Sequence, residues 1–138
     1  MFAPALVLTA AVVSMPMIMP LHAGERYLTS DDQLISHGRE LWLKNCETCH
    51  GYGIADAPIP MQPEEWRFRL SKGKPVLYEH AINGFIGPDY SMMPARGGND
   101  ELTDEEIRLA VDYMVFLASY YIDKLEINTE VNNDSTTD

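Results

Sequence analysis

The sequence has few basic residues and few cysteines, and both shortages exclude classes of protein. Ten Lys and Arg stand against 21 Asp and Glu, which gives a formal net charge of −11. A nucleic-acid-binding protein needs a basic face toward the phosphates, so this balance argues against one. Two cysteines exclude a multi-disulfide scaffold and a site of four thiolates within this chain. A length of 138 residues with 46% apolar composition fits one domain around a single core.

One apolar segment opens the sequence, and it reads as a leader. Residues 2–21 carry no charged side chain, and the segment is followed by Ala23–Gly24, a small-residue exit of the kind that signal peptidase accepts. About 20 apolar residues can also span a bilayer, so an uncleaved membrane anchor is the alternative. Three prolines within the segment disfavour a regular membrane helix. We therefore expect residues 1–23 to be a signal peptide and the protein to be periplasmic, with membrane association if the segment is retained.

Beyond the leader the pattern is that of helices joined by irregular loops. Capping residues at 29–32 precede a helix predicted to end near Asn45, and apolar residues recur along one side of it. Pro63 and Gly73 bound a second helix, and a third spans residues 75–83. No strand alternation and no internal repeat are evident, so the sequence predicts an all-α fold.

The last helix has the clearest start in the chain. Thr103 and Glu106 form a capping box, and an apolar side continues beyond it. Glycines and prolines predict irregular loops over residues 46–61 and 85–99. The polar residues 128–138 are predicted to be a disordered tail.

Both cysteines belong to one short motif, Cys46-Glu47-Thr48-Cys49-His50. This C-x-x-C-H pattern is typical of c-type haem attachment. Two thiols three positions apart at a helix end can each form a thioether to one haem vinyl group. The adjacent imidazole of His50 then serves as the proximal ligand of the iron. The motif predicts one covalently bound haem c.

Other uses of a C-x-x-C pair are less consistent with the rest of the chain. A thioredoxin-like redox pair lies near a βαβ pattern, which is not found here. A zinc site needs further Cys or His at ligand spacing, and neither His37 nor His80 provides it. A disulfide at this short spacing would constrain very little of the chain.

Further spacings resemble class I cytochromes c. Gly38, Trp42 and Cys46 follow the spacing G-x-x-x-aromatic-x-x-x-C of that class. The chain is most similar to the cytochrome c5 family of bacterial monohaem cytochromes over about residues 34–117. The segments that carry this resemblance are Ala57-Pro58; Trp66, Arg69 and Gly73; Leu77, His80, Ala81 and Gly84; and Met93-Pro94-Ala95-Arg96-Gly97. In the last of these, Ala95 stands where the family has a second proline. The resemblance implies a small class I cytochrome c fold over residues 24–127, with helices wrapped around one covalently bound haem.

Three further cofactor contacts are expected. In class I cytochromes c a proline carbonyl orients the proximal imidazole, and Pro58 is the matching residue here. Trp66 is expected to pack beside the cofactor with its N–H toward a haem propionate. Arg69 is expected to pair with a propionate, because buried anions favour bidentate cations. The alternative for Arg69 is a solvated basic face formed with the other cations of residues 67–74.

An electron carrier needs a sixth iron ligand that excludes exogenous ligands, and a methionine opposite histidine meets this need. Of the four methionines outside the leader, Met92 and Met93 lie in a loop that could cover the open haem face. Neighbouring residues in an extended loop point to opposite sides, and Pro94 favours extended backbone at Met93. The resemblance also places the ligand directly before the proline. We predict His50 and Met93 as the iron ligands, with His80 as the alternative to Met93.

These features together favour an electron carrier over an enzyme. The predicted function is transfer of single electrons between extracytoplasmic redox partner proteins, with no catalytic residues. A haem-bearing subunit of a larger dehydrogenase or oxidase complex would leave the same sequence marks. A haem peroxidase or ligand-binding sensor would need an open iron, which a methionine in the loop disfavours. Five acidic residues within 100–106 are predicted to attract a partner with a basic docking patch.

Overall fold

The computed structural model describes residues 27–134, and in this range it is mostly helical. The helices are α1 (Gln33–Asn45), α2 (Glu47–His50), α3 (Pro63–Ser71), α4 (Lys74–Asn83) and α5 (Asp104–Asp134). Single 3-10 turns lie at η2 (Ile54–Asp56), η3 (Pro88–Tyr90) and η4 (Ala95–Gly98). A small antiparallel hairpin pairs β1 (Phe85–Ile86) with β2 (Met92–Met93). The all-α prediction is confirmed, and the two-residue strands are too short for the sequence pattern to show.

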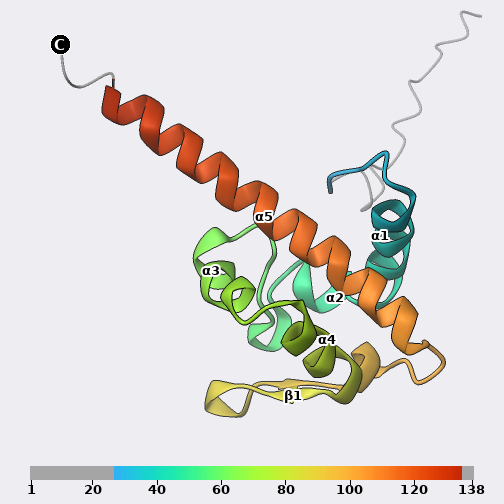
Figure 1. Ribbon diagram of the computed structural model, residues 1–138. Coiled ribbons are helices and arrows are strands. Elements are labelled where there is room, and N and C mark those ends of the chain that lie inside the picture. Colours follow the sequence, from blue (N-terminus) through green and yellow to red (C-terminus); the bar gives the residue numbers. More distant parts are fainter. Residues whose placement is uncertain (1–26, 135–138) are drawn as a thin grey trace, which may run out of the picture.

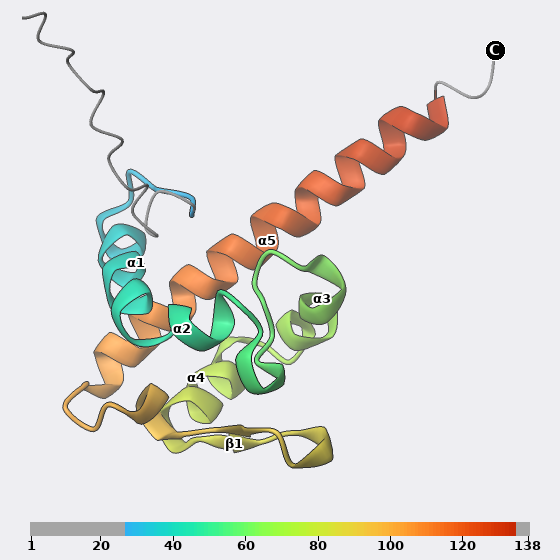
Figure 2. The same ribbon diagram turned by 180° about the vertical axis from the view of Figure 1, so that it is seen from behind.

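The long helix α5 organises the fold. It runs diagonally across the molecule, with α1 on one side and α3 and α4 on the other (Figures 1 and 2). The main buried cluster joins α5 to α1 and α3, and a smaller one joins α5 to α4. The buried members of the two clusters are Tyr27, Trp42, Trp66, Ala110, Tyr113, Met114, Leu117 and Ala118, and Ala81, Ile107 and Val111. Burial of these apolar side chains is the main force that holds the helices together.

The closest contact in this packing is between α1 and α5. At Gly38 the two backbones approach so closely that an added Cβ would lie 2.2 Å from the Leu109 carbonyl oxygen. One turn further along α1, the fully buried ring of Trp42 lies between Tyr27 and Tyr113, at ring centroid distances of 4.7 and 5.6 Å. The glycine and the aromatic residue of the predicted motif therefore serve one helix crossing.

The first and last of the predicted helices, α1 and α5, are capped by side chains at their starts. Asp32 Oδ1 accepts hydrogen bonds from the backbone N–H groups of Leu34 and Ile35 at 2.8 and 3.1 Å. In the capping box, Glu106 Oε2 accepts from the Thr103 N–H at 2.8 Å and Thr103 Oγ1 accepts from the Glu106 N–H at 3.2 Å. These bonds satisfy backbone donors that the helix itself leaves unpaired.

The predicted tail is wrong for residues 128–134. No glycine or proline follows Ala118, and α5 continues past the predicted boundary at residue 127 to Asp134. Just before this boundary, an ion pair of 2.7 Å between Arg67 and Glu126 joins α5 to α3. The predicted signal peptide, residues 1–23, and the end of the tail, residues 135–138, lie outside the described residues. Within residues 27–134, no helix combines the length and apolar character needed to cross a membrane.

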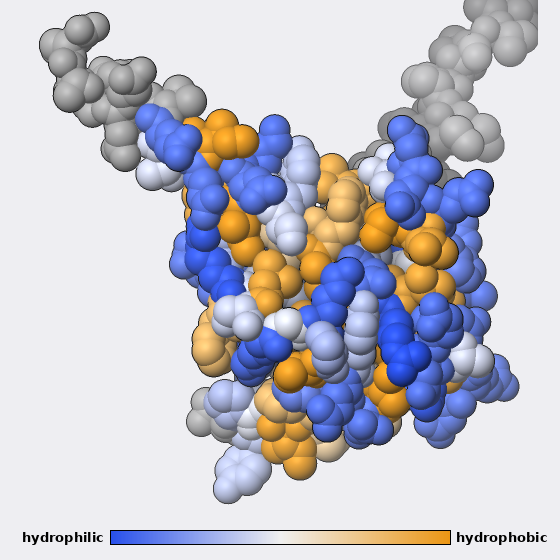
Figure 3. Space-filling model, in the orientation of Figure 1, coloured by the Kyte–Doolittle hydropathy of each residue, from blue (hydrophilic) through white to orange (hydrophobic). Residues whose placement is uncertain are grey.

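The hairpin presents apolar side chains to solvent. Ile86 and Met92 are cross-strand partners and are 69% and 65% exposed, and Tyr90 at the turn is 92% exposed. Figure 3 shows hydrophobic side chains gathered at the lower end of the molecule, where this hairpin lies. The other side of the hairpin is packed, as described below.

Candidate haem site

The attachment motif occupies the sharp junction of two helices. Cys46 lies between the helices as the C-cap of α1 and the N-cap of α2, and its carbonyl accepts from the N–H groups of Cys49 and His50 at 3.2 and 2.9 Å. One helical turn therefore carries both thiols and the imidazole. Cys46 is half-buried, Cys49 is exposed and His50 is 7% exposed.

The cysteines suit an uncharged covalent role. Burial, and then the neighbouring Cys49, raise the pKa of the Cys46 thiol to about 12. A reactive redox dithiol needs a lowered thiol pKa, so this environment does not favour thioredoxin-like chemistry. A thioether sulfur carries no charge and tolerates such burial. Among residues 27–134, no group of three or more His, Cys, Asp or Glu side chains is placed to hold a metal ion, which also argues against the zinc alternative.

His50 is prepared as a neutral ligand with a fixed orientation. Its Nδ1 donates to the Pro58 carbonyl oxygen at 2.9 Å, which leaves Nε2 available to a metal. Burial lowers the pKa of His50, Arg69 lowers it further, and the hydrogen bond to Pro58 opposes both. The structure thus gives Pro58 the contact that the resemblance implied.

The peptide group that follows Pro58 is held from its other side by Glu65. The N–H of Ile59 donates to Glu65 Oε2 at 2.8 Å. Glu65 is an acidic residue in the first turn of α3, and nothing in the sequence signals that its carboxylate reaches back to Ile59.

Trp66 and Arg69 lie on α3, close to this loop. Trp66 is 3% exposed, and its indole Nε1 finds no hydrogen-bond partner in the part of the chain that the structure describes. A buried indole N–H normally has an acceptor, so this orphaned donor fits a cofactor carboxylate. Arg69 is half-buried and its Nη1 donates to the Glu65 backbone carbonyl, which leaves its other donors for a second partner.

The hairpin directs the side chains of the two candidate methionines to opposite sides. Met93 is half-buried and packs against the cluster of Ala81, Ile107 and Val111, whereas Met92 is 65% exposed. Gly84 allows the close approach, because it has a φ of +83° and a Cβ there would lie 3.1 Å from the Met93 carbonyl. The predicted alternation is present, with Met93 on the inner side.

Two contacts hold the loop after Met93. Asn99 Nδ2 donates to Asn45 Oδ1 at 2.9 Å, which ties the loop to the residue before Cys46. Arg96 donates to the Leu102 carbonyl at 2.6 Å and to Asp104 Oδ1 at 2.5 Å, although its φ of 55° is unfavourable for a side-chain-bearing residue. The loop is therefore fastened to both α1 and α5.

His80, the alternative ligand, has a packing partner. Its ring stacks on Phe85 with a centroid distance of 4.1 Å and an interplanar angle of 20°. The stacking supports a structural role for His80 on the inner side of β1.

These contacts define a c-type haem protein of the class I type, with both thiols and a fixed neutral imidazole on one turn. The family described as cytochrome C oxidase, cbb3-type, subunit III matches residues 33–114, and the chain belongs to this cytochrome c family. The predicted cofactor, one covalent haem c with its iron, is thereby confirmed.

Named relatives and a solved structure agree with the family. Cytochrome c-555 of Prosthecochloris aestuarii is 36% identical over 84 residues, which are 59% of this chain and 85% of the relative. Cytochrome c-555 of Chlorobaculum tepidum is 38% identical over 78 residues, 56% of this chain and 71% of the relative. A chain in the crystal structure of an electron transfer complex of nitrite reductase with cytochrome c matches with a TM-score of 0.52 and 32% identity, covering 59% of this chain and 94% of that chain. The prediction of a class I monohaem cytochrome c is confirmed, and its relatives are cytochromes c.

Proposed function

We propose that the protein carries single electrons between redox partner proteins outside the cytoplasm, and that His50 and Met93 would hold the iron of its haem. The buried His50 carries this proposal, because its Nδ1–H is held by the Pro58 carbonyl at 2.9 Å and its Nε2 is left to act as a ligand. The chain's membership of a cytochrome c family supports electron transport as its role.

Each residue of the site has one task in this function. When bound, the haem supplies a one-electron couple. Cys46 and Cys49 hold it by thioethers, and His50 presents a neutral nitrogen in a fixed orientation. Trp66 Nε1 and the remaining donors of Arg69 would pair with propionate oxygens of the haem. Met93 would hold the iron together with His50 and would keep small molecules from it.

The inner position of Met93 favours an electron carrier over a peroxidase or a ligand-binding sensor, because those need an open sixth position. A haem-bearing subunit of a larger dehydrogenase or oxidase complex uses the same site and the same couple. Purification from the native source distinguishes a free electron carrier from such a subunit, because the subunit would be obtained together with its partner subunits.

The acidic residues at the start of α5 support a partner with a basic docking patch. Three of the five also have local roles: Asp104 pairs with Arg96, Glu105 lies 3.7 Å from Arg108, and Glu106 completes the capping box. The remaining field acts over about 10 Å at 0.1 M salt, so electron transfer to such a partner slows as salt rises. The leader-like residues 1–23 support export to the periplasm, which the intact mass of native protein tests by an N-terminus at Gly24.

The experiment that tests the ligand set compares two adjacent substitutions in the holoprotein. We expect Met93→Ala to abolish the weak sulfur-to-iron charge-transfer band, lower the reduction potential and allow carbon monoxide to bind. Met92→Ala is the matched control, because its side chain is exposed, and it should leave all three unchanged. The opposite pattern would assign the ligand to Met92, and no effect of either substitution would favour His80.

A further inference from the structure

One peptide group links His50 to a carboxylate on another helix. The carbonyl of the Pro58–Ile59 peptide accepts from His50 Nδ1 at 2.9 Å, and the N–H of the same peptide donates to Glu65 Oε2 at 2.8 Å. The two bonds lie on opposite ends of one rigid, planar unit. Glu65 is half-buried, so water screens its charge less than it screens that of an exposed acid.

Hydrogen bonds that share a polar group strengthen one another. A carboxylate that accepts from an amide N–H shifts electron density toward the oxygen of that amide, which then attracts a proton donor more strongly. The Pro58 carbonyl thus draws the Nδ1 proton of His50, and the ring becomes a better donor at Nε2. A hydrogen bond from the ring nitrogen that does not bind the metal raises the basicity of a ligand histidine in this way.

We propose that Glu65 is a positioning residue that sets the donor strength of His50 through the Pro58–Ile59 peptide. This inference rests on His50 as the iron ligand under the proposed function. A stronger nitrogen donor stabilises the oxidised state of a bound metal more than the reduced state. The charge of Glu65 therefore lowers the reduction potential of the protein.

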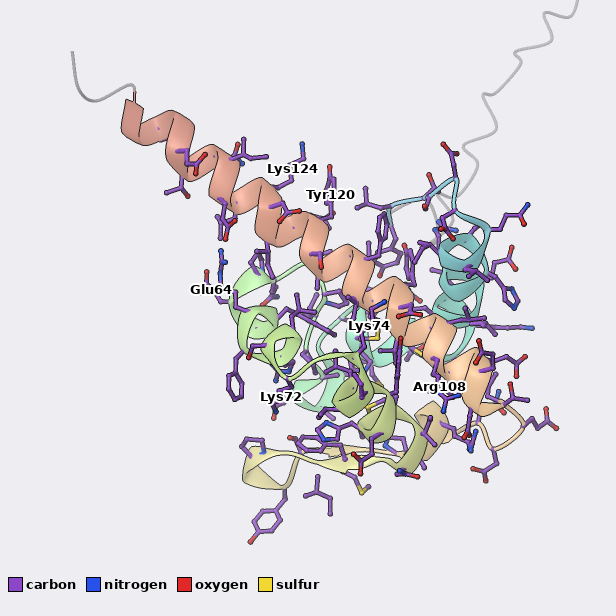
Figure 4. The ribbon with its side chains drawn as sticks, in the orientation of Figure 1. Glu64, Lys72, Lys74, Arg108, Tyr120 and Lys124 are labelled. Atoms are coloured by element: carbon purple, nitrogen blue, oxygen red, sulfur yellow. The ribbon has the colours of Figure 1, made fainter. Side chains whose placement is uncertain are left out.

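A simpler role for Glu65 is to fasten the loop before α3, and a matched pair of substitutions separates the two roles. Glu65→Gln keeps an oxygen that can accept from the Ile59 N–H and removes only the charge. Glu64→Gln removes the same charge from the preceding residue, which is exposed on the outer edge of α3 and makes no bond to this peptide (Figure 4). Both proteins are compared with the wild type as holoproteins.

The first measurement is the reduction potential. We expect Glu65→Gln to favour the reduced state by about threefold, which at 59 mV per tenfold for one electron is about 28 mV. Glu64→Gln should give less than half of this shift. Equal shifts for the two variants, or no shift for Glu65→Gln, would overturn the proposal.

The second measurement is the proton resonance of His50 Nδ1–H in the reduced, ¹⁵N-labelled protein. A weaker bond to Pro58 moves this resonance upfield in Glu65→Gln but not in Glu64→Gln, and a role in loop fastening alone would not do so. The same spectra test the ligand itself, because ring protons of an axial histidine are strongly shifted by the haem ring current. Unshifted ring protons would refute His50 ligation, whereas shifted ring protons with an unmoved Nδ1–H would refute only the role of Glu65.

If Glu65→Gln does not yield folded holoprotein, Glu65→Asp replaces it. The shorter carboxylate cannot reach the Ile59 N–H as closely, so a smaller shift in the same direction is expected for both measurements. A potential and a resonance identical to those of the wild type would overturn the proposal.

Discussion

Replacing Gly38 by alanine tests the helix crossing on which the site is built. In a solvent-exposed helix this change is stabilising, because alanine is favoured over glycine by about 1 kcal/mol. At Gly38, however, the new Cβ would lie 2.2 Å from the Leu109 oxygen and 2.9 Å from the Leu109 carbon. Both atoms belong to the backbone of α5, so no side-chain rotation can relieve the clash.

The magnitude follows from the separation that the two helices must adopt. An ordinary contact begins at 3.4 Å, so α5 would have to retreat by about 1 Å along a crossing that buries Trp42, Tyr113 and Leu117. Overpacking of this kind costs about 1–3 kcal/mol and occasionally more. Because both clashing atoms are backbone, we take the upper end of this range, about 3 kcal/mol. Less the gain of about 1 kcal/mol in helix propensity, this leaves a net loss of about 2 kcal/mol and a decrease in Tm of roughly 10 °C.

The assay is guanidinium unfolding of the holoprotein, followed by helical circular dichroism and by the haem absorption band. Ser36→Ala is the control, because this residue is exposed on the same helix and the change reports propensity alone. The control should be neutral or slightly stabilising. A Gly38→Ala protein as stable as the wild type, or more stable, would refute the reasoning about the close approach.

Two further predictions concern the ligand loop and the stability at high pH. Asn99→Ala removes the 2.9 Å hydrogen bond to Asn45, so the ligand loop should open about fivefold more often. In stopped flow, carbon monoxide should therefore bind to the reduced protein about fivefold faster. Asn128→Ala is the control and should have no effect. Burial and a 2.6 Å bond to Asp112 raise the pKa of Tyr78 to about 12 from about 10, so the folded state holds this proton more tightly than the unfolded state. The contribution of this proton to the free energy of unfolding should be fully present below pH 10 and be lost as the pH rises through 12. In chemical unfolding, Tyr78→Phe should make the decrease with pH less steep. Part of the decrease should remain, because the pKa of Tyr113 is also raised to about 12.

Contacts between residues close in the sequence are predictable from local patterns. Contacts between distant residues are predictable only where a known family motif specifies them. The capping box at Thr103 and the attachment turn at Cys46 depend on residues three or four positions apart, so their pattern is visible in the chain. The position of Pro58 followed from a resemblance rather than from local rules. Met93 was placed on the inner side because alternation in extended backbone is a local property.

Other contacts have no local signature. Glu65 reaches Ile59 because the loop between them turns back toward α3, and Asn99 reaches Asn45 across 54 positions. The polar composition after residue 127 predicts a tail, whereas the absence of glycine and proline allows α5 to continue to Asp134. Its pairing of Glu126 with Arg67 depends on where α3 lies, which the sequence alone does not show.

The crossing of α1 and α5 has a consequence for the order of events during biosynthesis. The side of α1 that carries Trp42 is covered by residues of α5, and α5 begins only at Asp104. Because the chain is made from its N-terminus onward, Cys46, Cys49 and His50 are exposed before α5 is available to bury α1. The two thiols are thus accessible for thioether formation before α1 packs against α5.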